Sequence, residues 1–319
     1  MKTLTERLTR GAWEGLFPRW RAPSDRPKAR AHDDALRITW LGTAGHVVQT
    51  KTTTILLDPY LSRPRFRDLA RERLVSDERA IRAWIPKHVD AVLCGHSHFD
   101  HLLDAPKIAI LTGAKLCGSR STCNVGRGAG VPEAQLLEVP PEGRTFTIGD
   151  VEARFVPSLH GRIALGRVPF PVEIRTASSS PMRMWHYRMG GAFGILLRTR
   201  AGSGSGPTVY HNGSADLIDA EVVGEHADVL LIGLAGRKGT RDYVHRLIAA
   251  LNPSVIVPTH HDLFFSPLEE GLRMIPGIDL DGFVMEARGE APHASIMLPN
   301  YGEPLQIPNV DPRGATFVD

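Results

Sequence analysis

The sequence has 319 residues, of which 42% are hydrophobic and 23% charged, as in an ordinary soluble globular protein. It contains no apolar run long enough to span a membrane, and its first residues lack the apolar core of a secretory signal. Its three cysteines, Cys94, Cys117 and Cys123, make no disulfide framework, so we expect a reduced, cytoplasmic protein.

The net charge of +3 is unevenly distributed, because residues 1–31 hold eight lysines and arginines against three acids. Tryptophan and other apolar residues are interspersed with these bases, so the segment suits either contact with an anionic membrane surface or packing on the domain. We favour packing, because two glycines and Pro18 would interrupt a helix. The basic excess is confined to one arm, and no nucleic-acid-recognition module is visible. We therefore divide the chain into a basic extension, residues 1–34, and a single domain, residues 35–310.

The apolar patterns along the domain predict alternating strands and helices. In the first half we expect strands at residues 36–41, 46–50, 53–57, 90–94, 115–118, 135–139, 144–148 and 151–157, with a helix capped by Ser76 and others at 102–111 and 121–127. In the second half we expect strands at residues 193–198, 208–211, 229–234 and 254–259, with a helix at 241–251. The arginines between residues 63 and 73 alternate with acids, which is typical of a solvated face. His46 lies within a predicted strand, where packing is its expected role.

Four potential metal ligands lie within six residues, directly after the predicted strand at 90–94: His96, His98, Asp100 and His101. Neutral imidazoles and a carboxylate suit zinc, iron or manganese. His96 and His98 can point the same way from an extended segment, which leaves the other two side chains for a second ion. The sequence therefore predicts a metal site where a strand ends and a loop begins.

This His-x-His-x-Asp-His pattern after a buried strand resembles the signature of the metallo-β-lactamase superfamily, over about residues 35–300. The resemblance implies an α/β fold, the four-layer αββα sandwich, and two divalent metal ions, expected to be zinc, with manganese or iron as alternatives. It also implies three further metal ligands after later strands: His160, Asp216 and His260. The implied first site consists of His96, His98 and His160, and the second of Asp100, His101 and His260, with Asp216 bridging. Asp100 would also be catalytic, by orienting the attacking water.

Two positions leave alternatives open. In the family the bridging aspartate often follows a glycine directly, whereas here Ser214 follows Gly213 and aspartate comes only at Asp216. If the segment stays extended, Asp216 keeps the same face; if it turns, His211 is the substitute candidate. His261 either reaches the substrate or points away from it. Asp58, which ends the third predicted strand, either orients a ligand histidine from behind, as the resemblance implies, or caps a turn before a proline.

Residues 161–192 form a long insertion directly after His160, rich in methionine and aromatic residues. Long loops in compact domains are commonly lids or binding loops, so we predict that Trp185, His186 and Tyr187 bind substrate. The alternative is a loop anchored by a hydrophobic cluster of its own.

The implied function is metal-dependent hydrolysis, in which a metal-bound hydroxide attacks the substrate. No nucleophile elbow, phosphate-binding loop or dinucleotide fingerprint competes with it. The segments Trp40-Leu41-Gly42 and Leu57-Asp58-Pro59 are similar to the branch containing N-acyl-phosphatidylethanolamine phospholipase D and L-ascorbate-6-phosphate lactonase. A phosphodiester or phospholipid-like substrate is therefore expected, with peripheral membrane contact as an option. A lactone or β-lactam is the alternative substrate, and a non-catalytic metal-binding protein is the alternative class.

Overall fold

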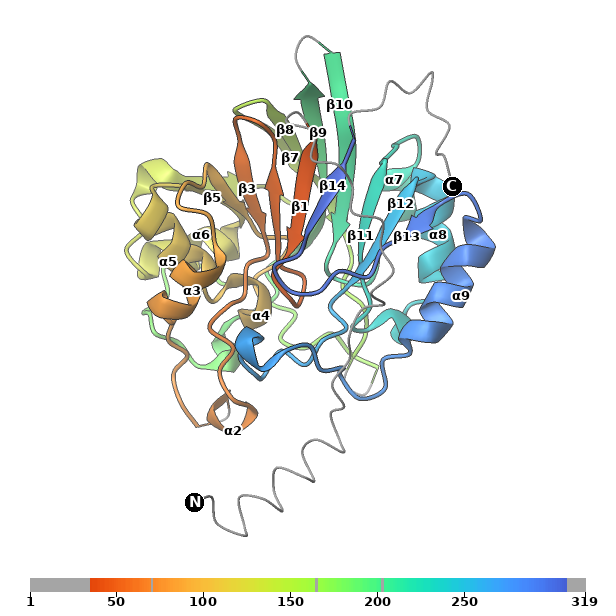
Figure 1. Cartoon of the computed structure of the whole chain (residues 1–319). Coiled ribbons are helices and arrows are strands. Elements are labelled where there is room, and N and C mark those ends of the chain that lie inside the picture. The colour runs from red at the N-terminus through yellow and green to blue at the C-terminus, as the bar shows by residue number, and fades with distance from the viewer. Residues whose placement is uncertain (1–34, 70, 164–165, 202–203, 309–319) are drawn as a thin grey trace, which may run out of the picture.

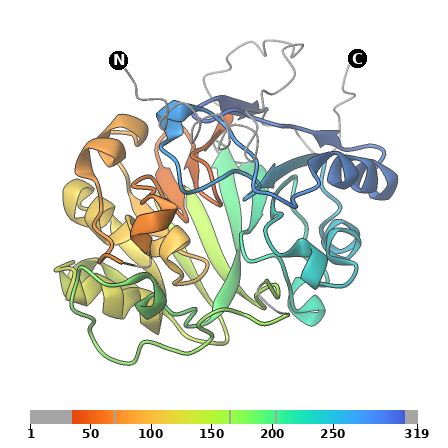
Figure 2. The ribbon, with the colours of Figure 1, turned by 90° about the horizontal axis from the view of Figure 1, so that it is seen from below.

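The computed structural model describes residues 35–69, 71–163, 166–201 and 204–308. Over these residues, two β-sheets of seven strands each pack face to face, and helices cover their outer sides (Figure 1). Viewed from below, helices of the first half of the chain lie on one side of the strands and those of the second half on the other (Figure 2). The expected αββα sandwich is confirmed. The predicted N-terminal extension, residues 1–34, lies outside the described residues.

The first sheet has the strand order β14-β1-β2-β3-β4-β5-β6. Its strands are β1 (Leu36–Trp40), β2 (His46–Gln49), β3 (Thr54–Leu57), β4 (Ala91–Leu93), β5 (Lys115–Ser119), β6 (Leu136–Val139) and β14 (Pro304–Ile307). The strands from β3 to β6 are parallel, so each connection must return from one end of the sheet to the other. In such sheets these crossover connections are usually helices. The helices of this half are α2 (Phe66–Leu69), α3 (Glu78–Trp84), α4 (Phe99–Leu102), α5 (Ala105–Thr112), α6 (Arg120–Gly128) and the 3-10 turn η1 (Glu133–Gln135).

The second sheet has the strand order β13-β12-β11-β10-β9-β8-β7. Its strands are β7 (Arg144–Ile148), β8 (Val151–Ser158), β9 (Ala192–Ala201), β10 (Gly204–Asn212), β11 (Val229–Gly233), β12 (Val255–Thr259) and β13 (Ser295–Ile296). The helices of this half are α7 (Asp219–Val222), α8 (Tyr243–Leu251) and α9 (Leu280–Glu290), with the 3-10 turns η2 (Met184–His186), η3 (Arg237–Gly239) and η4 (Leu268–Glu270). Among the described residues, no helix combines the length and apolarity that a bilayer crossing requires.

The hydrophobic core lies in three layers. This explains why some strands alternate between apolar and polar residues while others are apolar throughout. Alternating residues of β1, such as Leu36 and Ile38, face the space between the sheets. β11 is buried along its whole length, because Leu231 faces the other sheet while Leu230 packs on the side of α8 and α9. Burial on both faces is why this strand is continuously apolar in the sequence.

The carboxyl ends of the parallel strands meet at one edge of the sandwich. β3 and β4 run in parallel register, and so do β10, β11 and β12. Segments that follow these strands therefore emerge side by side, although they are far apart in the sequence. Such edges are the usual ligand-binding places of parallel sheets.

Three local expectations need correction. The helix expected at residues 102–111 begins only at Ala105, as α5, because Pro106 is favourable only in a first helical turn, and Leu102 ends the separate helix α4. The cap of α3 is Asp77, whose carboxylate accepts from two backbone N–H groups, whereas the Ser76 hydroxyl donates to the Leu103 carbonyl. α9 was not expected.

The insertion after His160 crosses to the helices of the first half. Asn124 and Ser121 of α6 hydrogen bond the backbone of Ile174, and the Leu74 N–H donates to the Met182 carbonyl. Ile174, Met182 and Tyr187 are buried in the core beneath these helices. This part of the insertion is thus held by a hydrophobic cluster, as the alternative interpretation proposed.

Candidate metal centre

The segment between β4 and α4 supplies four of the predicted ligands. β4 ends at Leu93, and His96 and His98 follow in the loop. His98 is the residue that precedes α4, whose first turn contains Asp100 and His101. One turn of helix therefore brings the last two side chains back toward the first two. All four residues are buried, with exposed fractions of 8% or less.

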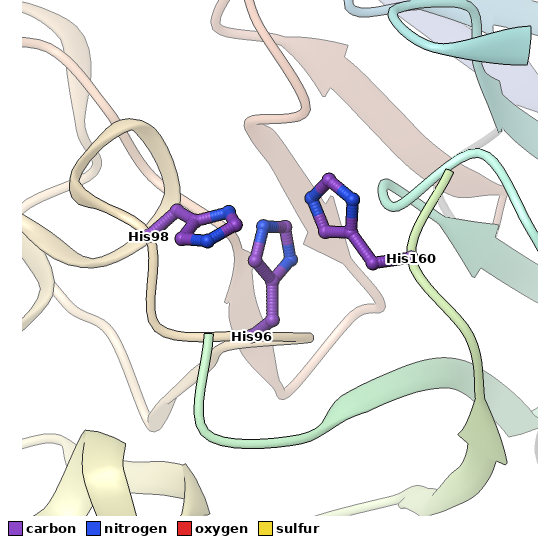
Figure 3. Close-up of side chains that lie close together, drawn as sticks. All are labelled: His96, His98 and His160. Atoms are coloured by element: carbon purple, nitrogen blue, oxygen red, sulfur yellow. The ribbon is translucent and has the colours of Figure 1, made fainter. Parts of the chain in front are cut away.

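His96, His98 and His160 form the first group of candidate ligands. Their rings point toward one another from two segments, the loop after β4 and the end of β8 (Figure 3). The ring centroids are 4.7 to 4.9 Å apart, and one possible ligand atom from each residue lies within 4.8 Å of the others. A single metal ion bound between them would have three neutral nitrogen ligands.

Asp100, His101 and His260 form the second group, with ligand atoms again within 4.8 Å of one another. Nε2 of His260 lies 3.3 Å from Oδ2 of Asp100, and Nε2 of His101 lies 3.8 Å from the same oxygen. The rings of His96 and His101 are 3.8 Å apart, so the two groups adjoin. The second group differs from the first because it contributes a negative charge.

The buried Asp58 carboxylate contacts the backbone of the ligand loop and the ring of a candidate ligand. Oδ1 accepts from the Gly95 N–H at 2.7 Å, and Oδ2 lies 2.9 Å from Nδ1 of His101 and from Nε2 of His211. Burial opposes ionisation of this carboxyl, but His101 and His211 outweigh it and hold the pKa of Asp58 well below its usual range. The arrangement orients the His101 ring with Nε2 toward Asp100, as a carboxylate behind a ligand histidine does.

The histidines of the first group are kept neutral by their surroundings. Burial first, and then the neighbouring histidines, lower the pKa of His96, and the same two causes bring the pKa of His160 to about 4. Burial also lowers the pKa of His98. For His101 burial acts in the same direction, but Asp58 and Asp100 outweigh it and raise the pKa. Neutral imidazoles can coordinate a cation without first losing a proton.

The ring nitrogens in the first group fit a metal ion. Nδ1 of His160 donates to the Gly161 carbonyl and Nε2 of His98 donates to the Pro169 carbonyl, so each ring keeps its other nitrogen for coordination. Both nitrogens of His96 are buried without a hydrogen-bond partner among the described residues. Buried polar atoms are normally paired, so an unpaired imidazole facing two others indicates a site for a cation.

Asp216 lies in neither ligand group. In this structure it is therefore not placed to bridge two ions, contrary to the expectation from the sequence. β10 ends at Asn212, and Ala215 has a φ of +57°, so the chain turns instead of staying extended. The Asp216 carboxylate accepts from the Leu217 N–H and lies 3.6 Å from Arg246 of α8. His211, the substitute candidate, contacts Asp58 and is in neither group. Within the described residues, each group thus has three candidate ligands, with no bridging carboxylate.

A cleft of about 890 Å³ opens over the candidate metal centre. It is lined by five of the six grouped residues: His98, Asp100, His101, His160 and His260. The insertion reaches this cleft through its first residues and through Met184. One part of the insertion is therefore anchored by a hydrophobic cluster, and another part lines the cleft.

The four residues predicted to bind substrate do not line this cleft. Tyr187 is 3% exposed and packs in the core, and His186 lines a separate cavity within the insertion. Trp185 lies beside Arg183, whose guanidinium carbon is 5.3 Å from the ring centroid. The buried His261 ring stacks on Trp40 with centroids 4.8 Å apart. Packing on neighbouring segments, which the sequence does not reveal, directs these side chains elsewhere.

Other residues line the cleft and were missed. Phe264 and Phe265 lie a few residues beyond His260, and Arg162 lies two residues beyond His160. Lys238, in η3 beyond the end of β11, completes the lining on the second sheet's side. The sequence signal that could have identified these lining residues is their position shortly after a predicted ligand or strand end.

Comparisons with known proteins agree with this fold and site. A family model described as the beta-lactamase superfamily domain matches residues 37–260. A "UPF0173 metal-dependent hydrolase" of Anaeromyxobacter dehalogenans is 31% identical over 236 residues, covering 71% of this chain and 75% of the relative. One from Pyrobaculum arsenaticum is 30% identical over 235 residues, covering 72% and 85%. The solved structure of Igni18, a metallo hydrolase from Ignicoccus hospitalis, shares the fold with a TM-score of 0.51 at 18% identity, covering 86% and 99%.

A sandwich of two sheets with histidine and aspartate groups at one edge defines the class of metallo-β-lactamase-fold proteins. The chain belongs to the metallo-β-lactamase superfamily and, within it, to the family of UPF0173 metal-dependent hydrolases. The finer resemblance, to the phospholipase D and lactonase branch, is not part of this identification.

Proposed function

We propose that the chain is a metal-dependent hydrolase of phosphodiesters, with a phospholipid-like molecule as the substrate. The observation that carries this proposal is the pair of adjoining ligand groups, buried beneath a cleft that is lined by apolar side chains and by cations. The names of the relatives support the reaction type, because they are called metal-dependent hydrolases.

The candidate ligands would hold two metal ions, which we propose to be zinc, with manganese or iron as alternatives. His96, His98 and His160 would hold one ion, and Asp100, His101 and His260 the other. Bound divalent ions would activate water and stabilise negative charge on the substrate. Asp100 faces the cleft, and it would accept a hydrogen bond from the attacking water and so orient it. Asp58 would hold the His101 ring in place.

Cations at the cleft support an anionic substrate. Arg162 and Lys238 both line the cleft and are exposed, and the structure gives neither of them a carboxylate partner among the described residues. Lys238 donates only to the Gly277 carbonyl, whereas the neighbouring Arg237 is committed to Glu286 at 2.6 Å. Asp279 also lines the cleft, but two cations without an ion-pair partner in the lining still favour a phosphodiester over a neutral ester.

A side-by-side assay tests the proposal. Bis(p-nitrophenyl) phosphate and a phosphatidylethanolamine would be compared with a γ-lactone and a β-lactam, using the full chain loaded with zinc and then with manganese. We expect turnover of the phosphodiesters, abolished by His96→Ala. Hydrolysis of lactones alone would overturn the phosphodiester assignment and favour the carbonyl hydrolase. Stoichiometric metal with no turnover of any substrate would favour the non-catalytic metal-binding protein.

We further propose that the reaction takes place in the cytoplasm, and peripheral contact to a membrane, as the source of a lipid-like substrate, stays the alternative to the packing expected for the N-terminal segment. All three cysteines are buried and unpaired, which agrees with a reducing compartment. Removal of residues 1–24 tests the membrane contact, through binding of the truncated and full chains to anionic liposomes.

A further inference from the structure

One wall of the cleft is a continuous row of phenylalanine rings. The Phe66 ring is 5.3 Å from the Phe265 ring, and the Phe265 ring is 4.3 Å from the Phe264 ring. The Phe264 ring in turn lies 5.4 Å from the ring of His260, a candidate ligand. Three aromatic side chains from two distant segments thus lead from the surface to the metal centre.

The outer end of this row is unusually open to water. The Phe66 side chain is 66% exposed, although it belongs to a helix whose Leu69 is only 3% exposed. Phe264 and Phe265 are half-buried, so the row becomes more enclosed toward His260. Folding alone gives no reason to leave a large aromatic ring in water at a cleft entrance, whereas exposed apolar surface there is typical of a binding site.

A second part of the cleft lining carries cations. It is formed by the loop after β11, with Lys238, and by Arg162 of the loop after β8. These two loops touch, because a Cβ added to Gly239 would lie 2.2 Å from the Arg162 carbonyl oxygen. The cleft therefore combines the phenylalanine row with two cations from other segments, within a lining that is otherwise mostly apolar and that also includes Asp279.

We infer that the Phe66–Phe265–Phe264 row binds the alkyl chain of an anionic amphiphile, whose charged group lies toward Arg162 and Lys238. The inference rests on the proposed function, because it places the scissile group at the metal centre. The occupant follows from the two kinds of side chain in the lining: an apolar chain covers the rings, and a negative charge complements the cations. A small polar phosphodiester would leave the aromatic row uncovered.

Binding of two alkyl phosphates tests the inference without requiring turnover. Decyl phosphate, below its critical micelle concentration, and ethyl phosphate would be titrated into the full chain as purified with its metal, by calorimetry. We expect decyl phosphate to bind at least tenfold more tightly, because burial of methylene groups is favourable. Phe265→Ala should weaken decyl phosphate about tenfold, Phe66→Ser about threefold, and both should leave ethyl phosphate unchanged.

The matched control is Val75→Ser. Val75 is 65% exposed, almost as much as Phe66, and lies on the same half of the molecule, but it is not part of this cleft. Its replacement should change neither affinity. Trp185→Ala is a second control, since Trp185 does not line the cleft. Phe66→Ser removes an exposed side chain, so it stays informative even if Phe265→Ala lowers stability.

The outcomes separate this inference from the proposed function. Equal affinities for the two phosphates, or a decyl preference that survives both phenylalanine substitutions, would overturn the inference even if phosphodiesters are hydrolysed. A decyl preference that depends on Phe66 and Phe265, together with no hydrolysis of any phosphodiester, would keep the binding site and reject the proposed reaction.

Discussion

At the scale of single residues, the candidate metal centre depends on which side chains the backbone directs inward. The loop after β4 presents His96 and His98, and the turn of α4 adds Asp100 and His101. Asp216 is directed toward Arg246 instead. The two kinds of position should respond differently to substitution.

We predict that His96→Ala loses at least one equivalent of bound metal and nearly all activity, because His96 lies in the first group and its ring adjoins the second. Asp216→Ala should keep its metal content. The comparison is made by elemental analysis of each purified variant at equal protein concentration. Normal metal in His96→Ala, or loss of metal in Asp216→Ala, would reverse the roles given to the two residues.

The buried His46 leads to a prediction about how the stability of the fold depends on pH. Burial first, and then His211, lower the pKa of His46 from 6.5 to about 3 in the folded state. Between pH 6.5 and 3 the unfolded chain therefore binds a proton that the folded state excludes, so stability falls as the pH falls through this window. One such group contributes up to about 1.4 kcal/mol per pH unit.

The prediction is checked with His46→Gln, which cannot take up this proton. Urea unfolding of the metal-free chain at pH 7, 6 and 5 gives the free energy of unfolding for each protein. The wild type should lose more stability than the variant between pH 6 and 5. Parallel losses would mean that His46 is not kept neutral by the fold.

At the scale of elements, a buried ion pair joins the segment after β3, where a solvated face was expected, to the segment after β12. Arg63 and Asp262 are fully buried, 2.7 Å apart, and Asp262 also accepts from the Thr43 N–H and the Tyr301 hydroxyl. Thr43 in turn accepts the N–H of His260 through its carbonyl, at 2.7 Å. The network therefore holds a candidate ligand in position through the backbone.

We predict that Arg63→Leu destabilises the fold by about 3–5 kcal/mol, because it leaves the Asp262 carboxylate buried without its cation. Arg82→Leu is the control, since its ion pair with Glu78 is exposed to solvent and should contribute little to stability. Chemical denaturation of the two variants measures both effects. A loss below about 1 kcal/mol for Arg63→Leu would show that the ion pair has little structural importance.

At the scale of the whole molecule, the candidate metal centre joins the two halves of the sandwich. His96, His98, Asp100 and His101 come from the first half, whereas His160 and His260 come from the second. Bound ions would therefore connect two sets of elements that also meet through the apolar surfaces of their sheets and through the Arg63–Asp262 network.

We predict that chelation lowers the thermal midpoint of the full chain. An ion at 100 times its dissociation constant stabilises the folded state by about 2.7 kcal/mol. Calorimetry with and without a chelator measures the shift, and His96→Ala should show a smaller one. An unchanged midpoint in a wild-type sample shown to have lost its metal would mean that the ions do not hold the halves together.

Much of this fold was readable from local patterns. The strands from β1 to β12 were expected within one to a few residues of their observed ends, because alternation or continuous apolarity depends on neighbours along the chain, whereas β13 and β14 were not expected. The loop from His96 to His101 was readable for the same reason, since four potential ligands lie within one short segment. His160 and His260 were implied by the family resemblance, which places further ligands after later strands.

What the tertiary structure decided concerns residues that meet only after folding. The turn at Ala215 removes Asp216 from the site, and the packing of the insertion against α6 carries Trp185 and Tyr187 away from the cleft. The row from Phe66 to Phe264 joins segments far apart in the sequence, and no local pattern connects them. The sequence by itself determined four candidate ligands, because they depend on spacing along one segment, and the resemblance of that segment to a known family implied the fold class and the ligands His160 and His260. The substrate wall depends on contacts between segments, which only the folded chain creates.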